Sequence, residues 1–195
     1  MTFQSPYYQA SYYVDNQLNT PKIALITGSP ANAQFKLSGD YAAFFTVTSA
    51  DGISVTIKMR TPLTEDILNE NAYIVIVLEA KAVNALDGLT IINIALPKKD
   101  DSSKKVLKFE KPLYQGTYST ADVLVLEPAI LTDEFSTNVS VSLSTDFEEY
   151  FTTEVVGSTV TIGLRKALTS DILDSYSVLS LVLEAQVEGA INGHT

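Results

Sequence analysis

The chain has 195 residues, no Cys, one His and a net charge of −10. This length fits one or two domains, and the acidic charge disfavours binding to nucleic acid, whose phosphates it would repel. The absence of Cys excludes disulfides, thiol catalysis and thiolate metal sites.

Along the chain, short stretches rich in Val, Ile, Thr, Tyr and Phe are separated by clusters of turn residues. Residues 53–59 read ISVTIKM and residues 159–164 read TVTIGL, and this period of two is typical of β-strands. No stretch shows three turns of helical periodicity. The pattern predicts an all-β protein made of antiparallel sandwiches. In chain order, the predicted strands are Phe44–Thr48, Ile53–Met59, Tyr73–Glu79, Thr90–Leu96, Asp122–Leu126, Asn138–Leu143, Thr159–Leu164 and Val178–Glu184.

The sequence also repeats itself. The segment FQSPYYQASY, which starts at Phe3, returns as FEKPLYQGTY, which starts at Phe109, an offset of 109 − 3 = 106 residues. A unit of this length is that of an immunoglobulin-like sandwich. We therefore expect two tandem domains, residues 1–97 and residues 109–195. Two later pairs support the repeat at an offset of 105: PLTEDIL (62–68) with ALTSDIL (167–173), and VLEA (77–80) with VLEA (182–185).

Residues 98–108 lie between the two repeats and are predicted to form a charged linker. Lys98, Lys99, Lys104 and Lys105 flank two aspartates and two serines, which is the composition of a solvated linker. The alternative is a polar hairpin inside one domain. The linker is favoured because the repeat starts again directly after this segment.

Both repeats contain the same motifs in the same order. An F-x-x-P-x-Y segment opens each repeat, and a leucine-led acidic segment follows at Leu63–Asp66 and again at Leu168–Asp171. The first repeat also has Phe45-Thr-Val47 before an alternating strand. Together these motifs resemble cadherin extracellular repeats. The resemblance implies cadherin-type sandwiches from an extracellular adhesion or receptor protein that contacts other proteins, homophilically or heterophilically, with a membrane reached only through a longer parent chain.

The calcium ligands that the resemblance implies are mostly replaced. Calcium binds six to eight oxygen atoms, but at the junction four lysines stand beside two aspartates. Asp15, Glu65 and Asp66 remain as a weak candidate calcium site near the outer pole of the first domain, and the alternative is that they are solvated loop residues. We expect no tight calcium at the junction and no other cofactor. The linker should then flex, and the angle between the domains should depend on direct contacts.

The sequence gives little support for catalysis. The single histidine, His194, is the penultimate residue, an implausible place for a catalytic base. Paired carboxylates such as Glu148 and Glu149 are interpreted as acidic turns between strands rather than as glycosidase-type acids. We therefore expect no enzyme and no catalytic residues.

Four tyrosines gather near the N-terminus: Tyr7, Tyr8, Tyr12 and Tyr13. Strand alternation would bury one set and expose the other, which would give an aromatic surface suited to a protein partner. The alternative is ordinary packing against the core. Asn138, in the segment Asn-Val-Ser, is an N-glycosylation acceptor and favours a secreted protein.

The second repeat reaches only to Thr195, which aligns with Thr90 of the first. We therefore expect its last strand to be lacking, which would leave backbone groups unpaired. The explanation is either an arbitrary truncation or a cleavage, after which a second polypeptide or another copy of the chain donates the strand.

The leading interpretation is a fragment of an extracellular, cadherin-like adhesion or receptor protein that mediates protein–protein contact or spacing. The alternative is a pair of β-sandwiches from another surface protein, such as a bacterial adhesin, with a structural or ligand-binding role.

Overall fold

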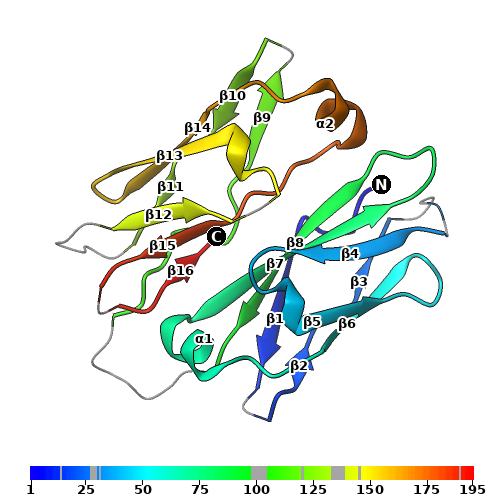
Figure 1. Ribbon diagram of the computed structural model, residues 1–195, viewed down its shortest axis with the longest axis horizontal. Coiled ribbons are helices and arrows are strands. Elements are labelled where there is room, and N and C mark those ends of the chain that lie inside the picture. The colour runs from blue at the N-terminus through cyan, green and yellow to red at the C-terminus, as the bar shows by residue number, and fades with distance from the viewer. Residues whose placement is uncertain are drawn as a thin grey trace.

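The computed structural model of the chain consists mainly of β-strands and loops (Figure 1), which confirms the all-β prediction. It describes residues 1–13, 15–26, 30, 32–97, 105–119, 121–132, 139–144, 146–188 and 190–195. Below, the first half means residues 1–97 and the second half means residues 105–195. Within the described ranges, no helix is long and apolar enough to cross a membrane.

The first half contains two sheets that enclose a common core. One sheet has five strands in the order β2-β1-β8-β7-β4, and the other has three in the order β3-β6-β5. Strand β1 runs parallel to β8, whereas β7 pairs antiparallel with both β8 and β4. The strands are β1 (Tyr7–Tyr12), β2 (Leu18–Asn19), β3 (Ile23–Ala24), β4 (Gln34–Ser38), β5 (Phe45–Thr48), β6 (Ser54–Met59), β7 (Tyr73–Lys81) and β8 (Gly88–Ala95).

The second half contains three smaller sheets, with the strand orders β10-β9, β11-β14-β13 and β12-β15-β16. In the part of the chain that the structure describes, each sheet takes its strands from one half only. The strands are β9 (Gly116–Ser119), β10 (Val123–Leu126), β11 (Ala129–Ile130), β12 (Ser140–Leu143), β13 (Phe151–Val156), β14 (Thr159–Leu164), β15 (Leu183–Gln186) and β16 (Gly193–His194).

Short helices stand at matching places in the two halves. The α-helices are α1 (Glu65–Glu70) and α2 (Ser170–Ser175), and the 3₁₀ turns are η1 (Ala42–Phe44) and η2 (Glu148–Tyr150). Thr64 caps α1 and Thr169 caps α2, and each hydroxyl accepts a hydrogen bond from the backbone N–H three residues later at 3.4 Å. The repeated Leu-Thr segment therefore encodes the start of each helix.

The turns that follow β1 and β9 are also alike. Asn16 and Asp122 have φ angles of 62° and 58°, in the left-handed region that Asn and Asp tolerate better than most residues. Each accepts a hydrogen bond from a tyrosine hydroxyl four residues earlier, from Tyr12 and Tyr118 respectively. The repeat seen in the sequence thus extends to individual backbone conformations.

The two cores differ in extent. In the first half, Ile74 and Ile76 of β7 and Ile92 and Ile94 of β8 are fully buried, and they belong to one large cluster with residues of β3 and β6. The second half has two smaller buried clusters. One comprises Leu107, Ala129, Leu131, Val160, Leu183 and Ala185; the other comprises Tyr150, Phe151 and Leu168.

One predicted strand is shorter than expected. The sequence predicts a strand over Val178–Glu184, but β15 begins only at Leu183 and residues 178–182 have no strand assignment. The equivalent part of β7, residues 73–77, is held by five residues of β8. In the second half the corresponding strand β16 has two residues, and they pair with Glu184 and Ala185, which follow residues 178–182 in the chain.

Candidate functional site: protein-contact surfaces

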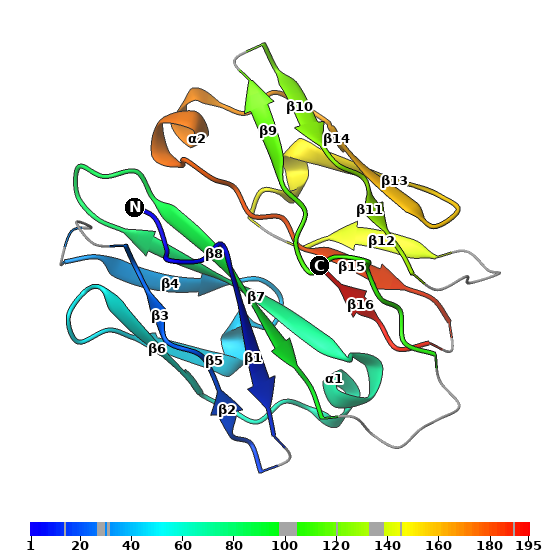
Figure 2. The same cartoon turned by 180° about the vertical axis from the view of Figure 1, so that it is seen from behind.

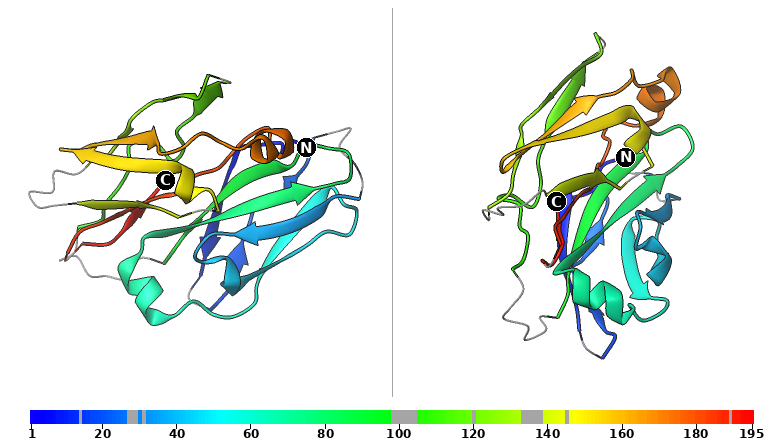
Figure 3. Two further views of the ribbon diagram at one scale, coloured as in Figure 1. Left: turned by 45° about the horizontal axis from the view of Figure 1, so that its top comes forward. Right: turned by 60° about the vertical axis from the view of Figure 1, so that its left-hand side comes forward.

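The two halves lie side by side, and the outer face of β7 and β8 packs against the second half (Figures 1, 2 and 3). Val75, Val77 and Ile91 are buried there in one cluster with Val182 of the second half. Strand β7 is therefore covered on both faces, which explains its nearly continuous apolar sequence. Tyr7, Leu89 and Leu113 pack around this cluster.

Two backbone hydrogen bonds join the halves and are equivalent to each other. Asp87 N donates to Ser175 O at 2.8 Å, and Asn192 N donates to Glu70 O at 2.7 Å. The offset of 105 converts one bond into the other, since 70 + 105 = 175 and 87 + 105 = 192. Equivalent positions of the two halves thus contact each other reciprocally, as in an isologous, twofold-related interface. We call it the twofold interface.

A polar cluster crosses one end of the twofold interface. The Tyr176 hydroxyl donates to Glu79 Oε1 at 2.8 Å, and Lys81 Nζ donates to the same hydroxyl at 3.3 Å. Lys81 Nζ also forms ion pairs with Glu79 Oε1 at 3.1 Å and with Asp87 Oδ2 at 3.3 Å. Burial alone would lower the pKa of Lys81, but these partners together raise it. Glu79 is 7% exposed, so its carboxylate has little contact with water, and the Lys81 ammonium and the Tyr176 hydroxyl compensate for the lost hydration.

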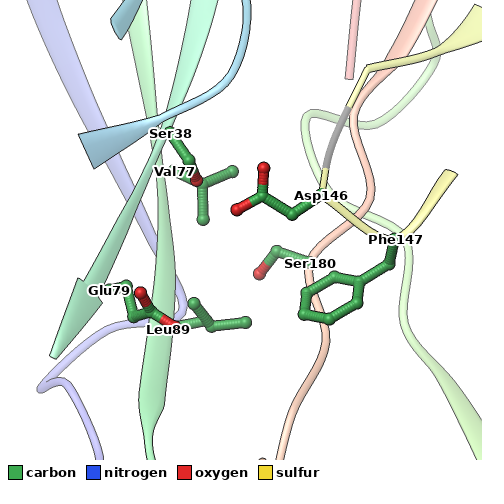
Figure 4. Close-up of a pocket in the computed structure, with 7 residues that line it drawn as sticks. All are labelled: Ser38, Val77, Glu79, Leu89, Asp146, Phe147 and Ser180. Carbon is green, nitrogen blue, oxygen red and sulfur yellow. The ribbon is translucent and has the colours of Figure 1, made fainter. Parts of the chain in front are cut away.

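A small cavity lies beside this cluster. Its volume is about 10 Å³, about the space that one water molecule needs. Figure 4 shows residues of both halves around it, with Glu79 and Leu89 on one side and Asp146 and Phe147 on the other. The cavity is a packing gap in the interface and is too small for an organic ligand.

A second polar cluster crosses the other end. His194 Nε2 lies 2.9 Å from Asn71 Oδ1, while Asn71 Nδ2 donates to Ile67 O at 3.0 Å. The amide is thereby oriented with its oxygen toward the ring, so the neutral imidazole carries its proton on Nε2 and donates it. The Tyr41 ring packs edge-on against the imidazole, with 6.0 Å between the ring centroids. Glu184 Oε1 lies 4.0 Å from His194 Nε2.

Burial dominates the titration of this second cluster. It lowers the pKa of His194 to about 4, although the Asp40 carboxylate opposes the shift. The pKa of Tyr41 is raised, first by burial and then by the charges of Glu184 and Asp40. Both groups are therefore neutral at pH 7, and the cluster is a hydrogen-bonded network rather than an ion pair.

A different surface stands out in the second half, which we call the open edge: the edge of β9 that faces away from β10, together with Val178–Val182. In the described residues β9 pairs with β10 alone, whereas its counterpart β1 also pairs with β8. Tyr114 and Leu181 are only partly buried and Gly116 is exposed. Their first-half equivalents, which are Tyr8, Ile76 and Ala10, are 8%, 0% and 2% exposed.

The four tyrosines near the N-terminus divide between the two faces of β1 and its C-terminal flank, as the alternation of side chains along a strand predicts. Tyr8 and Tyr12 are buried in the first-half core. Tyr7 packs at the twofold interface, and burial raises its pKa. Tyr13 is 49% exposed. The four residues therefore do not form one aromatic surface, and a contact role for them stays a prediction.

The calcium candidates are separate residues of the first half. Asp15 lies in the turn after β1, and Glu65 and Asp66 form the first turn of α1. Among the residues described, no three His, Cys, Asp or Glu side chains are grouped so that they could hold a metal ion. The calcium candidate thus has no clustered ligand set and stays a prediction. The glycosylation candidate Asn138 lies outside the described residues.

Sequence reasoning missed the polar residues of the twofold interface. Glu79 and Glu184 occupy the same place in the repeated VLEA segment, and a glutamate repeated inside an apolar strand is a signal of a special environment. Asn71 and Tyr176 are also equivalent to each other, but they differ in chemistry and gave no signal. His194 was judged by its place in the chain, although its side chain is 1% exposed.

Solved structures of cadherin extracellular domains match the chain over its whole length. Drosophila N-cadherin EC1-4 is 18% identical with a TM-score of 0.39, and the match covers 100% of this chain and 47% of that one. Mouse cadherin-23 EC22-24 is 18% identical with a TM-score of 0.36, and the match covers 100% of this chain and 62% of that one. Human protocadherin-24 EC1-2 is 14% identical with a TM-score of 0.37, and the match covers 100% of this chain and 92% of that one.

The chain therefore spans less than two thirds of the fly and mouse fragments. These structures come from the family that the sequence motifs resemble. No protein-family model matches the chain, and no curated protein matches it.

Proposed function

We propose that the chain is an extracellular, cadherin-like contact and spacing unit whose two repeats are fixed by direct contact rather than by calcium. The repeats are residues 1–97 and 109–195, with residues 98–108 as the linker. The observation that carries the proposal is the twofold interface, where Asp87 bonds to Ser175 and Asn192 bonds to Glu70.

The contacts of this interface are of the kind that hold two domains at a defined angle. Its centre is apolar, with Val75, Val77, Ile91 and Val182 buried together. Its two ends are polar and hydrogen-bonded. An apolar centre with hydrogen-bonded polar groups at its rim is typical of specific interfaces, and such contacts can set the angle between the repeats without a metal ion.

The partner in this proposal is another protein, bound homophilically or heterophilically, and a membrane would be reached only through a longer parent chain. A strand-donating second chain would bind at the second repeat. Asn138 would carry a glycan, and the unit would work by contact and spacing rather than by catalysis.

The absence of Cys from the sequence permits a direct test by resonance energy transfer. Val83 and Val156 are 79% and 68% exposed and lie in different halves, so Val83→Cys and Val156→Cys introduce one dye on each repeat. We expect the same transfer efficiency in millimolar calcium and in EDTA. A change in efficiency on calcium removal would contradict the proposal.

Two further measurements complete this test. The variant Glu79→Ala removes the carboxylate that Tyr176 and Lys81 share, and it should change the transfer efficiency in either buffer. Calorimetric titration with calcium should give no saturable heat. Saturable heat that Asp66→Asn abolishes would show instead that the acidic residues of the first repeat bind the ion.

Protein contact itself is testable on coated beads. Beads that carry the chain should aggregate alone if the contact is homophilic, or only with cells or beads that carry the partner if it is heterophilic. In both cases EDTA should leave aggregation unchanged. Aggregation that requires calcium would contradict the calcium-independent part of the proposal.

A further inference from the structure

We infer that the exposed edge of β10 binds an extended segment of another protein, with basic residues at both of its ends, by β-strand addition. We call this surface the β10 edge: the side of β10 that faces away from β9, with the exposed side chains of Val123 and Val125. The inference rests on the proposed contact function and deepens it, because it assigns the contact to one strand and makes the partner a different protein.

Strand β10 has one backbone edge that is available for pairing. All four of its residues pair with β9, and in the described part of the chain β10 pairs with no other strand. The equivalent strand of the first half is β2, since Leu18 corresponds to Leu124 at the offset of 106. Strand β2 is also the outermost strand of its sheet, so an outer edge at this position is a property of the repeat.

The two edge strands differ in the side chains that they expose. Along β2 and its flank the exposed residues are polar, Gln17 and Asn19, and the strand has only two residues. Along β10 the equivalent residues are Val123 and Val125, which are 50% and 64% exposed. Proteins usually protect an outer edge with a short strand and polar or charged side chains. Strand β2 follows this rule, whereas β10 is longer and apolar, which is the pattern of an edge that a partner covers.

The outer face of the β9–β10 hairpin is also accessible. Ser119 and Thr117 of β9 lie opposite Val123 and Val125 in the ladder, and both are exposed. Leu124 points the other way and packs against the smaller core cluster that contains Tyr150. Figures 1 and 2 show the hairpin on the side of the second half that faces away from the first half. A partner therefore reaches the β10 edge while the twofold interface is formed.

The charges at the two ends of β10 indicate a basic partner. Asp122 stands directly before the strand and Glu127 directly after it, and both are exposed. Glu127 forms an ion pair with Lys111 at 2.6 Å. The charge of Glu110 also acts on this lysine, so that end keeps a net negative charge. A strand with Lys or Arg at both ends therefore fits beside β10 in either direction.

The same charges disfavour a second copy of the chain as the partner. If two β10 strands paired antiparallel about their centres, Asp122 of each copy would lie opposite Glu127 of the other. Like charges directly opposite each other destabilise a strand pair. Two chains with a net charge of −10 also repel each other as they approach. The contact at the β10 edge is therefore heterophilic.

The absence of Cys from the sequence permits a test by disulfide tethering to the full chain. Ala121→Cys places one thiol at an exposed position shortly before β10, and Asp15→Cys places one at the equivalent position before β2. Each variant is equilibrated in a thiol buffer with the strand peptide acetyl-Cys-Gly-Lys-Val-Thr-Val-Thr-Lys-amide, and mass spectrometry measures the mixed disulfide. Tethering raises the local peptide concentration, so even weak strand addition shifts this equilibrium.

A reference peptide separates strand addition from the effects of charge and thiol reactivity. In this reference, Gly-Ser-Gly-Ser replaces Val-Thr-Val-Thr between the same two lysines. We expect the strand peptide to be preferred over the reference by about tenfold or more at position 121, and by less than about twofold at position 15. Amide hydrogen exchange should show new protection in Val123–Leu126. Equal preferences at the two positions would overturn the inference.

Two altered peptides test the backbone and the charges separately. Pro in place of both Thr residues removes strand N–H groups, and this peptide should lose the preference at position 121. Glu in place of both Lys residues should lower tethering there by about fivefold at low salt, and high salt should reduce the difference. Stronger tethering of the Glu peptide would contradict a basic partner.

The first half supplies a matched variant of the chain. Val123→Gln with Val125→Asn copies the residues of the β2 flank onto the β10 edge, and both side chains are exposed, so the fold should be kept. This variant should lose the preference for the strand peptide at position 121. An unchanged preference would show that the two valines take no part in binding and would overturn the inference.

Light scattering of the original chain tests the choice of partner. We expect a monomer, because like charges meet when two β10 strands pair. A dimer that the double variant Val123→Gln and Val125→Asn dissociates would show that a second copy occupies the β10 edge, and the heterophilic assignment would fail. Energy transfer between the repeats reports on the twofold interface alone, so the inference and the proposed function fail or stand separately.

Discussion

The two halves of the chain have the same local structure but different cores. Each has a threonine-capped helix of six residues at the same place in the repeat, and each has a left-handed residue in the turn after its first long strand. Yet Ile76 is fully buried, while its equivalent Leu181 is partly exposed. Short-range sequence therefore sets the turns and caps, whereas burial depends on how many strands stand beside a residue.

This difference concerns strand partners rather than composition. The segment 178–182 reads VLSLV and has the β-branched and aliphatic residues of a strand. Its equivalent in β7 is a regular strand because β8 pairs with it. The comparison shows that an apolar, strand-like sequence becomes a strand only where the backbone groups on its edges find partners.

The largest expected effect comes from truncating equivalent core residues. Ile76→Ala should destabilise the first half by about 4 kcal/mol, because a fully buried side chain leaves a cavity. Leu181→Ala should cost only about 1.5 kcal/mol, since part of the side chain is already in water. Urea unfolding with hydrogen exchange read separately for each half measures both values. Equal losses would contradict the difference between the two cores.

The next effect is the pH dependence of the twofold interface. The pKa of His194 is lowered to about 4 from an ordinary value near 6.5, so between these values the separated state binds a proton that the docked state does not. The free energy that favours the docked state over the separated state therefore falls as the pH falls from about 6.5 to 4, by up to about 3 kcal/mol in total. Energy transfer between dyes at positions 83 and 156 measures the loss.

A matched variant tests whether His194 is the cause. Leu89 is the first-half equivalent, so His194→Leu copies the other end of the twofold interface and removes the titrating group. This variant should flatten the pH profile between 4 and 6.5. An unchanged profile would point to the neighbouring carboxylates Asp40 and Glu184 instead.

A smaller effect is expected from one hydroxyl at the first polar cluster. Tyr176→Phe removes the donor to Glu79 and the acceptor for Lys81, and it should weaken the contact between the halves by about 1.5 kcal/mol. Lys81 stays beside Glu79, so the buried carboxylate keeps one partner. Tyr13→Phe, at an exposed side chain, is the control and should leave the energy transfer unchanged. A loss equal for both variants would contradict a specific role of Tyr176.

The smallest effect should be the same in the two halves. Thr64→Ala and Thr169→Ala each remove one helix N-cap and should each cost about 1 kcal/mol. The two losses should agree because the caps have the same geometry. Local hydrogen exchange in α1 and α2 measures them. Unequal losses would show that the difference between the halves extends to local structure.

Much of the fold could be predicted from the sequence. The alternation in residues 159–164 gave the bounds of β14, whereas the two six-residue helices were not predicted, although the repeated Leu-Thr segments mark the places where they start. These features depend on neighbours in the sequence, so a pattern of a few residues contains the information. The same reasoning predicted the division of the tyrosines into a buried and an exposed set, as Tyr12 and Tyr13 show.

The twofold interface could not be predicted in this way. It depends on which face of one half meets the other, and the residues that contact there are about a hundred positions apart, as Asn71 and His194 are. The strand predicted at residue 178 was wrong up to residue 182 for a related reason, because a period of two does not say whether a partner strand is present. The lysine-rich junction predicted a flexible linker and an angle between the domains that depends on direct contacts, but it did not indicate which surfaces of the two halves meet.

The twofold interface also limits how the chain can assemble. A twofold contact is closed: each half uses the same surface on its neighbour, and after one pairing that surface is saturated. Such a contact cannot propagate into a filament, and a third repeat could not add to it. A further partner of the pair would therefore bind to surfaces outside the twofold interface.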